Sequence, residues 1–190
     1  MRAFDYVVVL MSFVFALALT HVLSRVGEVL LARERVRHSG LQVLTIVNAV
    51  VTVYLDWLTL WDARTLQVWT LPATTVLFVF SAANYFTCVA ATPEVQAEGP
   101  VDLDASYWKN RRLFWGMILA LNVLAIPVNA LFLGSQSPQL FYSTSLATLP
   151  FFAPPLLALL VKAKWAQWVA GLALLVLSLT WMVVFNSALQ

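Results

Sequence analysis

Apolar residues occur along this chain in six long stretches, which polar or breaker-rich segments separate. Each stretch has about the length, roughly 20 residues, that an α-helix needs to cross a ~30 Å hydrocarbon core. A β-barrel would show weaker, alternating segments of about ten residues. The pattern therefore predicts an all-α integral membrane protein. Its six transmembrane helices are expected at residues 6–32, 41–61, 71–91, 112–133, 140–161 and 165–186.

The loops between these helices are short. The longest one, residues 92–110, is too small to form a separate domain. We therefore expect one transmembrane domain over residues 1–190. Short loops and compact size are typical of a prokaryotic protein, which predicts a multi-pass protein of the cell inner membrane.

The positions of the basic residues predict the orientation of the helices. Cytoplasmic loops of membrane proteins carry an excess of Lys and Arg. If the N-terminus is outside, the loops after the first, third and fifth helices are cytoplasmic. Of the 11 Lys and Arg residues, only Arg2 and Arg64 then lie outside. This asymmetry predicts that the N-terminus and the C-terminus are both extracytoplasmic.

Composition agrees with this class and excludes several others. Apolar residues make up 62% of the chain and charged residues 11%, whereas soluble domains have about 25% charged residues. A single cysteine, Cys88, excludes an intrachain disulfide and a thiolate metal cage. Basic residues do not gather into a patch with aromatic interleaving, so nucleic acid is not an expected partner. No zinc-protease or serine-hydrolase motif is present, and we expect no cofactor, no metal and no enzyme activity.

Two ionisable residues, His21 and Asp56, are predicted to lie inside the hydrocarbon. At 1.5 Å per residue they fall in opposite leaflets and cannot pair directly. An acid at this depth normally faces the bundle interior or a water-filled cavity, which favours an ion-pathway role for Asp56. A local bond to Arg64, Tyr54 or a tryptophan N–H is the alternative. His21 is either a neutral imidazole bonded to a neighbouring helix or a titrating group.

Asparagines on three further helices fall at a similar depth to His21. Asn48, Asn84 and Asn122 are each about 10–14 Å from the inner end of their helix. Together with His21 they predict a polar layer in the cytoplasmic half of the bundle. Such a layer lines an inward-open cavity or bonds the helices in a dry core, because asparagine is common between membrane helices.

Proline gathers in the fifth predicted helix. Pro150, Pro154 and Pro155 each remove a backbone donor, so a kink or break is expected there. Broken helices at membrane depth often mark transporter sites. The prolines are thus candidates for a hinge, and a static kink is the alternative.

These residues favour a small channel or secondary transporter for an ion, a proton or a small polar solute. Its pathway would include His21, Asn48, Asp56, Asn84 and Asn122. The second hypothesis is a non-catalytic sensor or partner subunit, whose cytoplasmic interaction surface would include Arg33, Arg35 and Arg37. The third is an intramembrane enzyme acting on a lipid. Besides the lipid bilayer, the expected partners are a membrane or cytoplasmic protein and further copies of the chain in a homo-oligomer.

Overall fold

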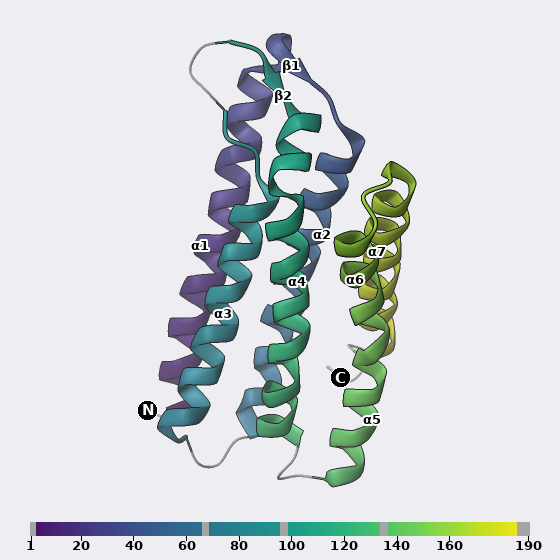
Figure 1. Ribbon diagram of the computed structural model, residues 1–190. Helices are drawn as coiled ribbons and strands as arrows, with labels where there is room; N and C mark the ends of the chain where they lie inside the picture. The colour runs from purple at the N-terminus through teal and green to yellow at the C-terminus, as the bar shows by residue number, and fades with distance from the viewer. Residues whose placement is uncertain (1–2, 66–68, 96–98, 134–136, 186–190) are drawn as a thin grey trace.

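The computed structural model of this chain describes residues 3–65, 69–95, 99–133 and 137–185. Within these residues, six helical spans are long and apolar enough to cross a membrane, which confirms the predicted number. The first four spans are single helices: α1 (Ala3–Leu31), α2 (Gly40–Thr59), α3 (Leu71–Ala91) and α4 (Leu103–Leu133) (Figure 1). The fifth span consists of α5 (Pro138–Thr148), the 3-10 helix η3 (Leu149–Phe152) and α6 (Ala153–Leu160). The sixth is α7 (Lys164–Phe185).

Helix α3 lies at the centre of one half of the bundle, where it packs against α1, α2 and α4. Helices α2 and α6 pack against α7 in the other half, and α4 joins the two halves. Helix α5 stands at the edge of the bundle (Figure 1) and contacts mainly α4 and η3. Neither α5 nor η3 has a buried residue, so this part of the fifth span is packed less tightly than α6, which buries Pro154, Pro155 and Ala158.

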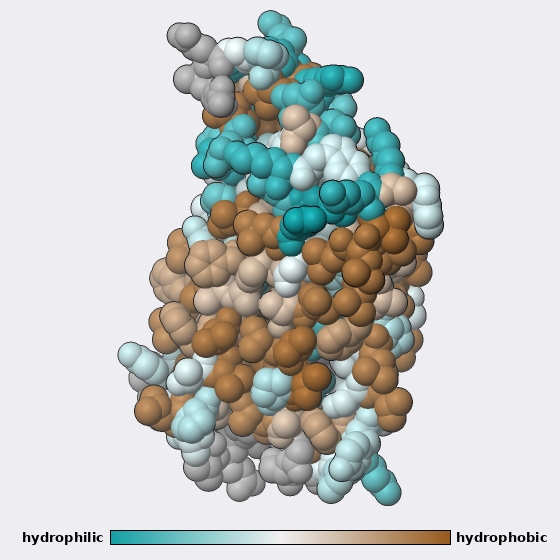
Figure 2. Space-filling model, viewed as in Figure 1, coloured by the Kyte–Doolittle hydropathy of each residue, from teal (hydrophilic) through white to brown (hydrophobic). Residues whose placement is uncertain are grey.

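The surface of the bundle divides into a polar end and an apolar belt. Figure 2 shows hydrophilic residues gathered at the end that contains the links from α1 to α2 and from α3 to α4. Hydrophobic residues cover the sides below it. Large apolar side chains such as Leu23, Leu113 and Val176 are more than half exposed on these sides. Such a belt is unfavourable in water, and together with the six spans it describes a multi-pass membrane protein.

A two-stranded parallel sheet at the polar end is the part of the fold that the all-α prediction missed. Strand β1 (Val36–Arg37) pairs with β2 (Val101–Asp102), with Val36 opposite Val101. Gly99 precedes β2 with a φ of +93°, a conformation that suits glycine. Its carbonyl accepts a bond of 3.1 Å from Arg35, which belongs to the 3-10 helix η1 (Arg33–Arg35).

The beginning of α4 also differs from the prediction. The helix begins at Leu103 rather than near residue 112. Asp102 causes this earlier start, because its carboxylate accepts bonds from the backbone N–H groups of Asp104 at 2.9 Å and Ala105 at 3.0 Å. An aspartate in this position caps a helix N-terminus. As a result α4 extends beyond the apolar belt and brings polar residues toward α6 and α7.

Helices α2 and α7 approach each other closely at Gly171. A Cβ atom there would lie 2.5 Å from Cδ2 and 3.0 Å from Cγ of Leu44 on α2. The same helix pair is also close at Gly40, where a Cβ would lie 2.8 Å from a ring carbon of Trp168. Glycine at these positions allows the two backbones to pack, as is common between membrane helices.

Replacing Gly171 with valine is therefore expected to lower the free energy of unfolding by about 1–3 kcal/mol, the usual cost of overpacking. Gly116 on α4 is the matched control, because no atom lies within 4 Å of the position of its Cβ. Thermal unfolding of both variants in detergent measures the difference. Equal losses for Gly171→Val and Gly116→Val would contradict the close approach of α2 and α7.

Candidate solute cavity

A cavity of about 450 Å³ lies between α2, α4, α5 and α7. Most of its residues come from the second halves of α2, α4 and α7 and from α5, so it occupies the half of the bundle away from β1 and β2 (Figure 1). Most of its wall is apolar, and Phe132, Phe151 and Trp181 supply aromatic surface. The polar side chains of the wall include Asp56, Asn122, Asn129, Ser143, Thr144 and Ser178.

Asp56 supplies the carboxylate of this cavity. It is held by Asn84 on α3, whose Nδ2 donates to Asp56 Oδ2 at 2.9 Å. The same Nδ2 donates to the carbonyl of Phe80 at 3.2 Å, one helical turn earlier. Asn84 is fully buried, and its Oδ1 has no partner among the described residues. Asp56 thus presents a carboxylate to the cavity while a buried amide holds it from the α3 side.

The contact between Asp56 and Asn84 was not expected from their depths. Asp56 lies near the end of α2 that is away from the polar end, whereas Asn84 was predicted to lie in the cytoplasmic half of α3. The two helices run in opposite directions, and side chains lean toward the N-terminus of their own helix. Asp56 therefore leans toward the polar end and Asn84 leans away from it. These opposite leans shorten the axial separation that a count of residues gives.

Asn122 lies where the fifth span changes from α5 to α6. Pro155 has no N–H, so the carbonyl of Phe151 lacks the donor that a continuous helix would provide four residues later. Asn122 Nδ2 supplies that donor at 2.7 Å from Phe151 O. The ring of Phe151 meets Trp181 edge to face at 5.7 Å. Both Asn122 and Phe151 line the cavity, so the cavity lies beside η3, the 3-10 segment of the fifth span.

The other two candidate residues lie elsewhere. Asn48 donates to the carbonyls of Leu44 at 2.9 Å and Gly171 at 3.0 Å, in the tight contact between α2 and α7. His21 Nε2 lies 3.1 Å from Oγ1 of Thr92, the residue that ends α3. The expected layer is therefore not one cavity wall. These side chains lie at similar depths but do not share a face of the bundle. Depth along the membrane normal does not determine the direction in which a side chain points around its helix axis.

A buried polar cluster that the sequence analysis missed joins α4, α6 and α7. We refer to Tyr107, Arg111 and Gln167 as the clasp, and each is at most 4% exposed. Arg111 donates to the carbonyls of Ala158 and Val161 at the end of α6. Gln167 donates to the same two carbonyls and accepts a bond of 2.7 Å from the Tyr107 hydroxyl. The clasp satisfies carbonyls that the end of a helix leaves free.

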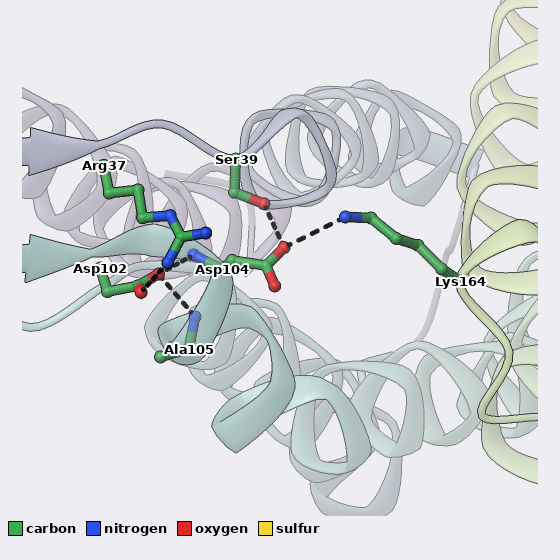
Figure 3. Close-up of polar contacts among 6 residues, drawn as sticks. All are labelled: Arg37, Ser39, Asp102, Asp104, Ala105 and Lys164. Carbon is green, nitrogen blue, oxygen red and sulfur yellow. Dashed lines mark hydrogen bonds and ion pairs between the residues drawn. The ribbon is translucent and has the colours of Figure 1, made fainter.

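Charged residues at the polar end connect β1, β2, α4 and α7. Figure 3 shows Asp104, whose Oδ1 accepts a bond of 3.2 Å from Ser39 Oγ and lies 3.8 Å from Lys164 Nζ. Beside it, Arg37 pairs with Asp102 at 3.4 Å. Of the three arginines proposed as an interaction surface, Arg35 and Arg37 thus bond within the chain, and Arg33 is exposed in η1. Arg25 and Glu28 form the ion pair that their spacing favours, at 2.8 Å.

The cap of α4 predicts a small dependence of stability on pH. The backbone N–H of Ala105, with that of Asp104 and the charge of Arg37, holds the pKa of Asp102 below its ordinary value. A lowered pKa stabilises the folded state above the unfolded pKa of about 3.9, and this stabilisation is lost as pH falls through the folded pKa. The difference in thermal unfolding between the wild type and Asp102→Asn should therefore be largest near pH 7, shrink as pH falls below about 4, and vanish below the folded pKa. A constant difference at every pH would contradict this role.

Comparisons with protein-family models, curated proteins and solved structures found no match to the chain. In the part of the chain that the structure describes, no three His, Cys, Asp or Glu residues gather as a metal site. Among the described residues, the cavity wall contains the Asp56 carboxylate, the Arg64 guanidinium, several neutral hydrogen-bonding groups and aromatic surface.

Proposed function

We propose that the protein is a channel or secondary transporter that admits a small polar or cationic solute to the cavity beside Asp56. The observation that carries this proposal is the exposure of the Asp56 carboxylate to a cavity of about 450 Å³ at membrane depth. Ligand sites are usually concave and mostly apolar, with a few polar groups that orient the ligand. An acid within a membrane span is costly and is typical of an ion or substrate pathway.

The orientation belongs to the same proposal. The polar end carries the basic residues of the α1–α2, α3–α4 and α6–α7 links, and basic links face the cytoplasm in most membrane proteins. We therefore propose that both termini are extracytoplasmic and that the cell inner membrane surrounds the apolar belt. The cavity would then lie in the outer half of the membrane.

The break in the fifth span is the proposed hinge. Pro150 lies in η3, and Pro154 and Pro155 lie in the first turn of α6. The loosely packed α5 can tilt about this break without disturbing α6, which the clasp holds at its far end. Such a tilt would widen or close the cavity, since Ser143 and Thr144 of α5 line it.

Blocking the cavity tests the proposed function. Ser178 on α7 is 3% exposed and lines the cavity, whereas Val176 on the same helix is 61% exposed on the apolar belt. In proteoliposomes, Ser178→Phe should reduce uptake of methylammonium or glycerol by about tenfold or more, which corresponds to roughly 1.4 kcal/mol. Val176→Phe should leave uptake unchanged. Equal uptake by the wild type and a folded Ser178→Phe variant would refute the proposal.

A role as a partner subunit is the second candidate, and the exposed Arg33 and Arg37 with the partly exposed Arg35 at the polar end favour it. The Arg37 side chain is 80% exposed despite its ion pair with Asp102. A cytoplasmic or membrane partner with an acidic surface would fit Arg33, Arg35 and Arg37. Co-purification of such a partner, and its loss on neutralising the three arginines, would favour this role over transport.

A further inference from the structure

The buried oxygen of Asn84 lacks a hydrogen-bond donor. Asn84 is 0% exposed, and its Oδ1 has no partner among the described residues. A buried acceptor without a partner is unfavourable, and such groups are rare in folded proteins. The feature therefore needs an explanation in the chemistry around Asn84.

Exchanging the positions of Oδ1 and Nδ2 in the Asn84 amide would not satisfy both atoms. Its Nδ2 donates to two acceptors, Asp56 Oδ2 at 2.9 Å and Phe80 O at 3.2 Å. Exchange of the two amide atoms would place Oδ1 against the Phe80 carbonyl, an acceptor facing an acceptor. The contact with Phe80 therefore fixes the amide orientation and leaves Oδ1 as an acceptor without a donor among the described residues.

A protonated Asp56 would supply this donor. A carboxylic acid and a primary amide can exchange two hydrogen bonds, one from the amide N–H to a carboxyl oxygen and one from the acid O–H to the amide oxygen. The first of these bonds is present in the structure. An ionised Asp56 has no proton to donate, so only the acid form can complete the pair.

We propose that Asp56 carries an exchangeable proton, shared with Asn84 Oδ1 while the cavity is empty and released when a cation enters. This inference rests on the proposed transport function and makes that transport proton-coupled. On release, the Asp56 O–H bond breaks, its electron pair stays on the carboxylate, and the proton passes to water in the cavity. The new carboxylate charge then balances the charge of the bound cation.

The surroundings of Asp56 contain few groups that would compete for this proton. Among the described residues, the other charged side chain that lines the cavity is Arg64, in η2 (Leu60–Thr65). Its guanidinium lies over the ring of Trp61, 4.7 Å from the ring centroid. The charged residues of α4 and α7 lie at the polar end, and α5 and α6 carry none. The remaining ionisable residues on α1 and α3 do not line the cavity: Asp5, Tyr6, His21, Arg25, Glu28, Tyr85 and Cys88.

Infrared difference spectroscopy of the full chain in detergent tests the proposal. Addition of methylammonium chloride to the wild type should remove a protonated-carboxyl C=O band and release about one proton per chain to a pH-sensitive dye. The band should be absent in Asp56→Asn and unchanged in Glu94→Gln, since Glu94 forms an exposed pair with Lys109. In Asn84→Leu the band should move in frequency, because the acid loses its amide partner.

The infrared and proton-release measurements on the wild type test the proposal even if a variant fails to fold. A wild type that loses no such band and releases no proton on cation addition would overturn the proposal. So would a band that persists in Asp56→Asn. The outcome is separable from the proposed function: solute uptake without the band refutes the proton pair alone, and the band without any solute uptake refutes transport.

Discussion

Replacing Asp56 with asparagine is expected to reduce cation uptake in proteoliposomes by about tenfold to a hundredfold. Hydrogen bonds that involve a charged group contribute about 1.5–3 kcal/mol, and each 1.4 kcal/mol is a factor of ten. The substitution preserves the size of the side chain, and its amide oxygen can still accept the bond from Asn84 Nδ2. Uptake should therefore fall while the fold persists.

Two comparisons make the Asp56→Asn result specific. Glu94→Gln also removes one negative charge, but at an exposed position far from the cavity, and should leave uptake unchanged. Thermal unfolding in detergent should show that Asp56→Asn is folded. Wild-type uptake by a folded Asp56→Asn variant would contradict the role given to the carboxylate.

Replacing Arg111 with alanine is expected to lower the free energy of unfolding by about 1.5–3 kcal/mol, the usual contribution of a hydrogen bond that involves a charged group. Arg111 is 4% exposed and donates hydrogen bonds to the carbonyls of Ala158 and Val161. A cation at a helix C-terminus is also favoured by the helix dipole. Its loss leaves Gln167 as the remaining side-chain donor of the clasp to these carbonyls.

The neighbouring arginine provides a close control. Arg112 has the same side chain but is exposed, so Arg112→Ala should change stability by less than about 0.5 kcal/mol. Thermal or denaturant unfolding of both variants in the same detergent gives the comparison. Similar losses for Arg111→Ala and Arg112→Ala would show that burial of Arg111 in the clasp is not what stabilises the fold.

The spans were predictable because membrane helices obey one strong rule. A bilayer admits continuous apolar runs of a narrow range of lengths, so six such runs indicate six spans. The early start of α4 was not predictable in this way, because it depends on two backbone bonds to Asp102. The parallel pair β1–β2 is equally local, and two-residue strands have no alternation to detect.

The site was only partly predictable for a related reason. Asp56 and Asn122 were predicted to be pathway residues because they are polar residues at membrane depth, and both line the cavity. Depth alone could not indicate that Asn84 meets Asp56, or that Asn48 bonds a carbonyl of α7. The clasp was missed because Arg111 stands in a basic trio that resembles an ordinary cytoplasmic flank. Only the earlier start of α4 turns Tyr107 and Arg111 toward the end of α6.

The most direct test of the account is whether water-borne reagents reach the cavity, and from which side. Cys88 is the single native cysteine, so its replacement by serine gives a background for single thiols. Ser178→Cys places a thiol in the cavity, and Ser81→Cys places one in the fully buried core outside it. With a charged, membrane-impermeant thiosulfonate, we predict that Ser178→Cys reacts from the side opposite the basic end and that Ser81→Cys does not react. An unreactive Ser178→Cys, or one that reacts only from the basic side, would contradict an outward-facing solute cavity.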